Sequence, residues 1–264
     1  MSKAQAAALC LVVAAHLAAA TSAARAEGQA GGVSPLITQV PESVRAVVFV
    51  ADGAGDFRCT SAALRQAVDD AGLPLDVETF VWSHGYRRRL ADQMDKRHAH
   101  AQGQRLAGLI AAHLQSCPGA SIYLLGHSAG AAVVLAAAEC LPPASVERVI
   151  LLAPALPADY DLRLALRATR QGIDVFCSGR DSCLRVVECL ELFKNGRCCT
   201  PAGSSGFRPL IHPAEEAALY GKLRQYPWNP GLECFGNDGG HSGCYQQEFL
   251  RAFVLPLLCE PTGW

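Results

Sequence analysis

The sequence contains 264 residues, of which 50% are hydrophobic and 18% are charged. This balance excludes an intrinsically disordered chain, because enough apolar surface is present to form a core. The 23 Lys and Arg residues nearly cancel the 24 Asp and Glu residues, and no basic block stands out, so binding to nucleic acid is not expected.

The first 26 residues have the features of a cleaved signal peptide. Lys3 gives a basic start, residues 4–20 are almost wholly apolar, and Ala24-Arg25-Ala26 forms a small-x-small cleavage pattern. An uncleaved membrane anchor is the alternative, but the apolar stretch is shorter than the roughly 20 residues that a span requires. We therefore expect an exported mature chain, residues 27–264, with no membrane span after cleavage.

Cysteine usage agrees with export. The chain has twelve cysteines, more than is typical of a cytosolic enzyme, and removal of Cys10 with the leader leaves an odd number, so at least one thiol lies outside internal disulfides. A zinc site formed by Cys234, His241 and Cys244 is the rival interpretation, but the spacing matches no familiar zinc motif. We expect disulfides, and no metal or cofactor.

Short apolar runs alternate with helix-forming segments along the first half of the mature chain. The run Ala46–Ala51 is continuously apolar, which is typical of a strand buried on both faces. Further strands are expected at residues 75–82 and 121–125. Helices are expected from Thr60 or Ser61 to about residue 71, at about 89–115, and at 128–140.

The same alternation continues toward the C-terminus. We expect a strand at 146–152, a helix at 161–171, a strand at 173–177 and a C-terminal helix at 246–258. This order predicts an α/β fold, with a mostly parallel sheet and helices on both faces.

Residues 184–235 interrupt the alternation. The segment carries four cysteines and is rich in Gly, Pro and Ser around residues 200–213. We therefore expect a single domain over residues 27–264, with a disulfide-rich insertion at about 184–235 that forms a lid or wall ahead of the loop containing His241.

A Gly-His-Ser-Ala-Gly motif at residues 126–130 follows one predicted strand and precedes a predicted helix. In this context the serine occupies a sharp, strained turn, and the flanking glycines let helix and strand approach closely. The helix N-terminus favours negative charge that develops nearby. The motif predicts that Ser128 is a nucleophile; a glycine-rich turn whose serine only caps the helix is the alternative.

With this motif in this setting, the sequence resembles the α/β-hydrolase superfamily of serine hydrolases over about residues 46–258. The resemblance implies a catalytic triad in the order serine, acid, histidine, with the acid after a later strand and the histidine near the C-terminus. Asp181 follows the predicted strand 173–177, and His241 lies in a glycine-rich loop before the C-terminal helix. These two residues match that order.

Each member of such a triad has a physical role. A neutral imidazole accepts the serine proton during attack, and an ionised Asp fixes its tautomer and stabilises the imidazolium. His84 is an alternative base, whereas His127 is disfavoured because neighbours on a tight turn point apart. Asp159 and Asp161 are alternative acids, because some superfamily members place the acid after the earlier strand.

The resemblance also implies an oxyanion hole made of two backbone N–H groups. Ala129 follows the nucleophile directly and is the first predicted donor. The second donor is expected after the first core strand, where His-Gly is frequent; here Asp52-Gly53 occurs instead, so Ala54 is the candidate. An acidic Asp52 near an oxyanion is unfavourable unless its carboxylate turns away, is neutralised or braces the loop. A dinucleotide fingerprint is disfavoured because Arg58 stands where its third glycine belongs.

The sequence therefore predicts an exported serine hydrolase acting on a small-molecule ester or lipid-like substrate, most favourably a carboxylic ester. Thioester and amide hydrolysis stay open as alternatives. The competing class is a non-catalytic binding domain that keeps the hydrolase fold, since fold alone does not establish activity.

Overall fold

The computed structural model describes residues 46–195, 200–209 and 214–259. The predicted signal peptide, Cys10, Cys198 and Cys199 therefore lie outside the described residues. No helix among those residues combines the length and apolar character needed to cross a membrane.

Six strands in the described residues pair into one parallel sheet. They are β1 (Ala46–Ala51), β2 (Leu75–Thr79), β3 (Ile122–His127), β4 (Val146–Leu152), β5 (Thr169–Cys177) and β6 (Leu223–Pro227), in the spatial order β2-β1-β3-β4-β5-β6. All of β3 and β4 is buried, as expected for central strands covered on both faces. The predicted α/β fold with a parallel sheet is confirmed.

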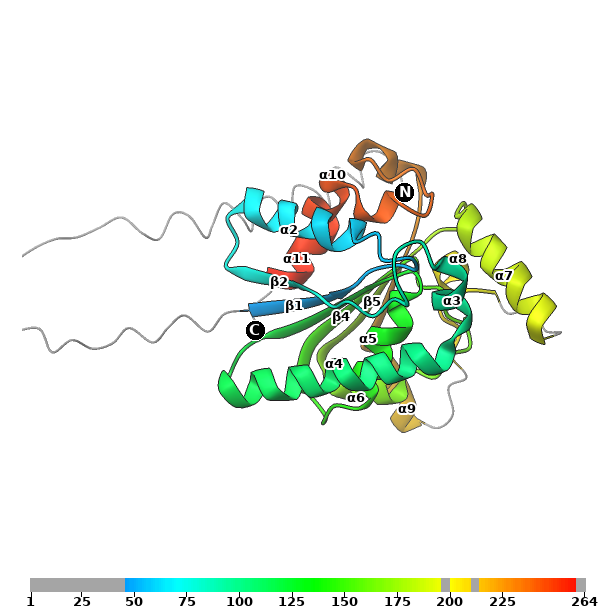
Figure 1. Ribbon diagram of the computed structural model, residues 1–264. Helices are drawn as coiled ribbons and strands as arrows, with labels where there is room; N and C mark the ends of the chain where they lie inside the picture. Colours follow the sequence, from blue (N-terminus) through cyan, green and yellow to red (C-terminus); the bar gives the residue numbers. More distant parts are fainter. Residues whose placement is uncertain (1–45, 196–199, 210–213, 260–264) are drawn as a thin grey trace, which may run out of the picture. The chain divides into compact units, whose positions relative to one another are not determined.

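Helices cover both faces of this sheet (Figure 1). They are α2 (Cys59–Ala71), α3 (Arg89–Met94), α4 (Lys96–Ser116), α5 (Gly130–Glu139), α6 (Arg163–Ala168), α7 (Ser182–Asn195), α8 (Ala202–Ser205), α9 (Ala214–Tyr220), α10 (Gln247–Phe249) and α11 (Leu255–Cys259). Three short elements complete the list: η1 (Pro230–Phe235), η2 (Gly243–Tyr245) and the π-helical turn η3 (Leu250–Val254). One apolar core includes Leu106 of α4 and Leu135 of α5, and the other includes Leu64 of α2 and Phe249 of α10.

Several predicted boundaries differ from the structure. The helix expected at 89–115 is divided at Asp95, whose side chain accepts a hydrogen bond from the His98 N–H and caps α4. The strand expected at 173–177 begins earlier, at Thr169, because Thr169 pairs with Val146 across an irregularity in β4. The helix before it therefore ends at Ala168 rather than at residue 171.

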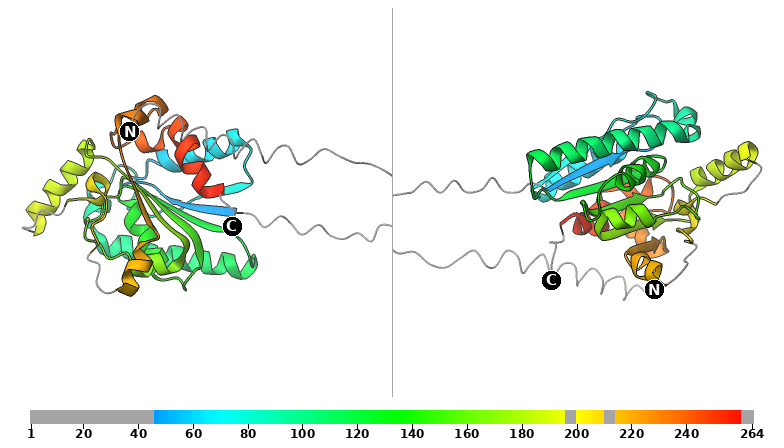
Figure 2. Two further views of the ribbon diagram at one scale, coloured as in Figure 1. Left: turned by 180° about the vertical axis from the view of Figure 1, so that it is seen from behind. Right: turned by 90° about the horizontal axis from the view of Figure 1, so that it is seen from below.

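The segment 184–235 is more regular than the sequence indicates. It contains most of α7, all of α8, α9 and η1, and the strand β6, which pairs with β5 along its whole length. Strand β6 (LRQYP) escapes detection because it lies at the sheet edge, and its residues are half-buried or exposed rather than continuously apolar. Figure 2 shows α7 projecting away from the sheet.

The predicted disulfide-rich insertion is wrong for the described residues. All nine described cysteines are free thiols: Cys59, Cys117, Cys140, Cys177, Cys183, Cys189, Cys234, Cys244 and Cys259. Backbone hydrogen bonds fix the segment instead. The N–H groups of Ala202 and Gly203 donate to the carbonyls of Leu156 and Pro154 at 2.7 and 2.8 Å. The chain is thereby tied to the loop after β4 without a covalent link.

The strand order reverses at β1, which has β2 on one side and β3 on the other. In parallel sheets of this kind, ligands bind beyond the carboxyl ends of the two strands that flank such a switch point. The serine motif follows β3, and Asp52-Gly53-Ala54 follows β1. The fold therefore places both segments at the same edge of the sheet.

Candidate active site

Ser128 occupies a strained turn between β3 and α5. Its φ angle is 53°, in the left-handed region that costs a non-glycine residue about 1–2 kcal/mol. A Cβ at Gly126 would lie 2.6 Å from Val134 Cγ2, and one at Gly130 would lie 2.1 Å from the Ala51 carbonyl oxygen. Both glycines are thus required by close packing, as the motif predicts.

Three side chains predicted from the sequence lie within hydrogen-bonding distance of one another. His241 Nε2 is 2.9 Å from Ser128 Oγ, and His241 Nδ1 is 2.6 Å from Asp181 Oδ2. The Asp181 side chain is 1% exposed and that of His241 is 22% exposed. A buried carboxylate favours the tautomer in which Nδ1–H donates to it, and this leaves Nε2 as an acceptor facing the serine hydroxyl.

Asp181 is oriented by the first turn of α7. Its N–H donates to the Ser178 carbonyl, and its Oδ1 accepts from the Leu184 N–H at 3.1 Å. This is the geometry of a helix N-cap. One carboxylate oxygen is therefore used to fix the side chain, and the other faces His241.

The loop that carries His241 is tied to the sheet by side-chain hydrogen bonds that the sequence does not predict. Ser178 Oγ donates to the Gly239 carbonyl at 2.7 Å, and Trp228 Nε1 donates to the Asn237 carbonyl at 2.9 Å. These pairs are separated by 61 and 9 residues, and no local sequence signal marks them.

His127 also contacts the loop that carries His241. Its Nε2 lies 3.2 Å from the His241 carbonyl oxygen, so it donates there, and the two rings are 4.8 Å apart. Burial lowers the pKa of His127 to about 3 because desolvation disfavours the imidazolium. The ring is therefore neutral, and its Nε2 is directed at the backbone of the His241 loop. This agrees with the expectation that His127 is not the base that deprotonates Ser128.

The alternative base and acids make other contacts. His84 Nδ1 is 2.9 Å from Asp92 Oδ1, and its ring lies 3.9 Å from the His98 ring. Asp161 accepts from Arg163 Nε at 2.8 Å, and Asp159 is exposed. The structure thus brings Asp181, rather than either of these acids, to His241.

The loop after β1 passes beside the serine. A Cβ at Gly53 would lie 3.3 Å from Ser128 Cβ. Within the described residues, neither the Ala54 N–H nor the Ala129 N–H donates a hydrogen bond. The two predicted oxyanion donors are therefore free to bind a ligand, and their role stays a prediction.

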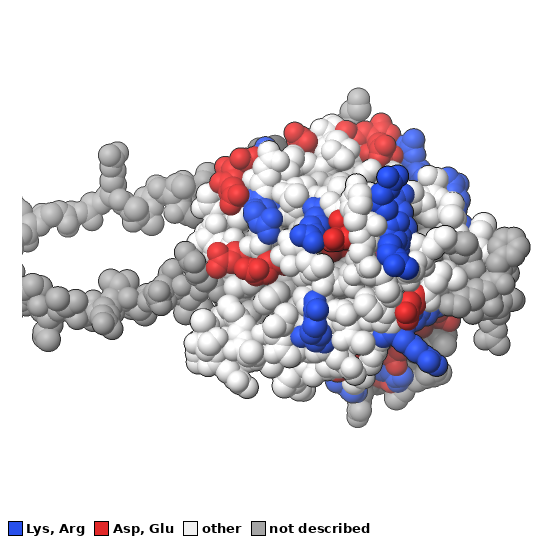
Figure 3. Space-filling model, in the orientation of Figure 1, with Lys and Arg blue, Asp and Glu red and all other residues white. Residues whose placement is uncertain are grey.

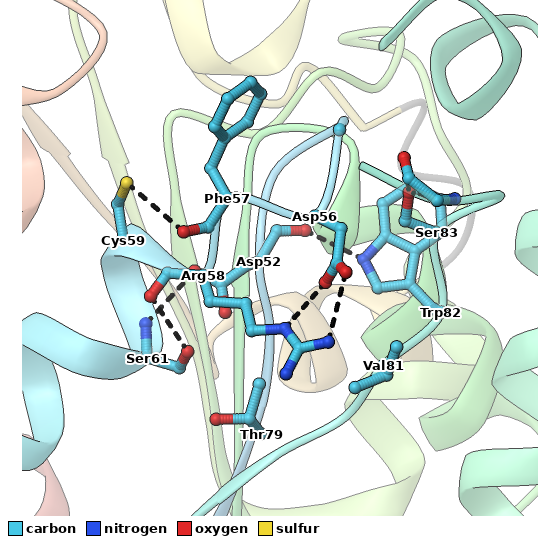
Figure 4. A network of polar contacts seen from close by, with 12 residues as sticks. Asp52, Asp56, Phe57, Arg58, Cys59, Ser61, Thr79, Val81, Trp82 and Ser83 are labelled. Atoms are coloured by element: carbon cyan, nitrogen blue, oxygen red, sulfur yellow. Dashed lines mark hydrogen bonds and ion pairs between the residues drawn. The ribbon is translucent and has the colours of Figure 1, made fainter. Parts of the chain in front are cut away.

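Asp52 turns its carboxylate toward α2 (Figure 4). Oδ1 accepts from the N–H groups of Thr60 and Ser61 at 2.8 and 3.1 Å, at the helix N-terminus. Its backbone carbonyl accepts from Trp82 Nε1 at 2.8 Å. Burial raises the pKa of Asp52. Asp52, which stands where the superfamily often has His, thus holds the loop after β1 in place. A bracing role of this kind is one of the alternatives that the sequence leaves open.

Asp92 also anchors the loop after β1, through Gly55. The sequence analysis does not predict this role. It is buried, and its Oδ2 accepts from the Gly55 N–H at 2.7 Å and from Ser83 Oγ at 2.5 Å. Its Oδ1 accepts from the His84 N–H at 2.8 Å. These hydrogen bonds lower its pKa even though burial alone acts in the opposite direction.

One group of metal-ligating side chains gathers among the described residues. Asp181, Cys183 and His241 have ligand atoms within 4.8 Å of one another. Cys234 and Cys244 do not belong to this group, so the zinc set considered from the sequence is not assembled. Asp181 and His241 are already hydrogen-bonded to each other, and this pairing accounts for their proximity without a metal.

A cavity of about 360 Å³ lies beside the turn, bounded by α3, α4, α5, α7 and the loop after β4. Ala129 and Ala155 form its end near the serine, and the Ala155 N–H donates to the Ser128 carbonyl at 3.0 Å. Its size falls in the range of small-molecule binding sites.

The family described as alpha/beta hydrolase of unknown function (DUF900) matches residues 36–197, more than half of the chain. No curated protein matches.

Several solved structures are similar in fold. A CIB-like hydrolase from Thermoplasma acidophilum has 18% identity and a TM-score of 0.47, covering 83% of this chain and 89% of its own. The catalytic core of acetyl xylan esterase from Trichoderma reesei has 15% identity and a TM-score of 0.43, covering 82% and 98%. A cutinase-like protein from Cryptococcus sp. has 15% identity and a TM-score of 0.41, covering 81% and 95%.

Proposed function

The chain belongs to the DUF900 family of α/β hydrolases, and from that premise we propose that it is a serine hydrolase of carboxylic esters. The observation that carries the proposal is the hydrogen-bonded series from Ser128 Oγ through both nitrogens of His241 to Asp181, at 2.9 and 2.6 Å. Such a series activates a hydroxyl that is otherwise a poor nucleophile.

The reaction proceeds through an acyl-enzyme. Ser128 Oγ attacks the acyl carbon while its proton moves to His241 Nε2, and Asp181 stabilises the resulting imidazolium. The tetrahedral intermediate collapses, the ester C–O bond breaks, and the leaving alkoxide takes the proton from Nε2. Water then repeats the sequence: it gives a proton to Nε2, attacks the acyl carbon and releases the acid as Ser128 regains its hydrogen.

Negative charge on the carbonyl oxygen is stabilised by the N–H groups of Ala129 and Ala54. Ala129 is the residue immediately before α5, so the positive end of that helix adds to its effect. The carboxylate of Asp52 is held at the start of α2, which supports the assignment because it does not compete with substrate for these donors.

Carboxylic esters are preferred over amides because an alkoxide leaves more readily than an amine. Hydrolysis of thioesters or amides by the same three residues is an alternative that differs only in the bond cleaved. The remaining alternative is a binding domain without turnover, in which Ser128 is unreactive although it contacts His241.

Covalent labelling with a fluorophosphonate tests the proposal. The native protein should be labelled at Ser128, as located by peptide mass spectrometry, and the label should disappear in Ser128→Ala. Ser116→Ala, an exposed serine on α4, is the matched control and should be labelled like wild type. A native, folded protein that takes up no label at Ser128 would indicate the binding domain.

The proposed substrate is a small ester or lipid-like molecule. Figure 3 shows basic and acidic side chains interspersed on one face of the molecule, and the formal net charge is −1, which supports a partner that is not strongly charged.

Export is proposed from the leader at residues 1–26. Expression in a secreting host, followed by N-terminal sequencing, should give a mature chain that begins after Ala26. A chain that retains its leader and stays inside the cell would contradict export.

A further inference from the structure

The cavity beside Ser128 is placed to receive one substituent of the substrate. Ala129 and Ala155 form its near end. Both residues adjoin Ser128: Ala129 follows it in the chain, and the Ala155 N–H donates to the backbone carbonyl oxygen of Ser128 at 3.0 Å. In a bound ester, the acyl carbon would lie at Ser128 Oγ and the carbonyl oxygen would accept from the Ala129 N–H. This position is at the end of the cavity formed by Ala129 and Ala155.

Apolar residues form most of the cavity wall, and five polar residues also line it: Asp92, Gln93, Lys96, His100 and Tyr160. Ala99 from α4 and Ala132 and Ala136 from α5 form one side, and Leu156 and Val187 form the other. Helices α4 and α5 pack tightly at Gly103, where a Cβ would lie 2.5 Å from Ala136 Cβ. The small side chains of Ala99 and Ala132 leave space beside that contact. Val187 belongs to the segment that the sequence predicts as a lid or wall.

Two of the polar groups on the walls, those of Asp92 and Tyr160, are hydrogen-bonded within the protein. Asp92 accepts hydrogen bonds from Gly55, Ser83 and His84. Tyr160 donates its hydroxyl hydrogen to Glu139 Oε1 at 2.7 Å. An alkyl chain in the cavity would leave the hydrogen bonds of Asp92 and Tyr160 intact.

Resting on the proposed function, we infer that this cavity is the acyl-chain site and that the enzyme prefers esters of medium-length fatty acids. A volume of about 360 Å³, at ~30 Å³ for an atom the size of a water molecule, holds on the order of ten non-hydrogen atoms. Each methylene buried in it raises kcat/KM roughly fourfold. Rates should increase from acetate to about octanoate or decanoate and then stop increasing, because the cavity is full.

The test is hydrolysis of p-nitrophenyl esters from acetate to palmitate by the full mature chain. In Ala132→Leu, three added carbon atoms occupy the space of about three methylenes, so the octanoate-to-acetate ratio of kcat/KM should fall by roughly 60-fold. Leu156→Ala widens the opposite wall and should move the optimum to longer chains. Ala112→Leu, at an exposed position of α4 outside the cavity, is the matched control and should keep the wild-type ratio.

The outcomes separate the two proposals. Fluorophosphonate labelling of Ser128 in each variant shows that the protein is folded and reactive. If labelling is retained but the ratio is unchanged in both Ala132→Leu and Leu156→Ala, or if wild type shows no dependence on chain length, the acyl-chain site is refuted and the serine hydrolase stands. If wild type neither labels nor hydrolyses any ester, both proposals fail.

Discussion

Acidification should destabilise the protein through His127. The imidazole is buried, and its pKa is lowered from the ordinary 6.5 to about 3. Between these two values the unfolded chain binds a proton at this residue and the folded chain does not. The free energy of unfolding therefore falls as the pH drops below about 6.5 and continues to fall until the folded-state pKa is reached.

The size of the effect follows from the pKa difference. Each pH unit inside the window is worth about 1.4 kcal/mol, and about 1.5 units of the window lie between pH 6.5 and pH 5. His127 alone should therefore remove about 2 kcal/mol on going from pH 7 to pH 5, a large share of the 5–15 kcal/mol typical of a domain.

Urea unfolding at pH 7 and pH 5 measures this term. In His127→Gln the side-chain amide can still donate to the His241 carbonyl, but it does not titrate. Wild type should lose about 2 kcal/mol more than the variant between the two pH values, with unchanged m-values. Asp52, whose pKa is raised by burial, is present in both proteins and cancels in the comparison. Equal losses in both proteins would refute the conclusion that His127 is neutral in the fold.

Three further outcomes follow from the geometry. Asp181→Asn should lower kcat by about 10³- to 10⁴-fold in steady-state ester hydrolysis, whereas Asp161→Asn should leave it within about twofold; similar losses in both would reject Asp181 as the acid. Gly130→Ala places a Cβ 2.1 Å from a β1 carbonyl oxygen and should reduce the unfolding free energy by about 3 kcal/mol. Gly108 is exposed on a helix with open space around it, so Gly108→Ala should increase that free energy by up to about 1 kcal/mol. If thermal melts show that both substitutions stabilise, or both destabilise, the packing argument is contradicted. Asp174→Ala removes a buried carboxylate that pairs with two arginines and should destabilise by about 3–5 kcal/mol in the same melts.

The sequence predicts those parts of the fold whose signal is local. The buried strands read as continuous apolar runs, and the turn at Ser128 needs only neighbouring glycines, so both were found. Strand β6 was missed because edge strands carry polar residues, and its partner β5 lies about 50 residues earlier in the chain.

The residues of the candidate site likewise differ in whether a local sequence signal marks them. Ser128 follows from its motif, whereas Asp181 and His241 were placed by family resemblance and by chain order. His127, Ser178 and Asp92 act through hydrogen bonds to backbone groups 37 to 114 residues away. Such contacts leave no pattern in a single sequence. The disulfide prediction is wrong for the described cysteines. A high cysteine content indicates an oxidising compartment, but it does not show which thiols lie close enough to pair.

The distance along the chain between Ser128 and His241 has a consequence for biosynthesis. The two side chains are 113 residues apart, and the imidazole comes from the last tenth of the polypeptide. A ribosome-bound or truncated chain that ends before residue 241 carries the hydroxyl but no group to deprotonate it. Under the proposed mechanism, hydrolysis therefore begins only after residue 241 has been synthesised and placed beside Ser128.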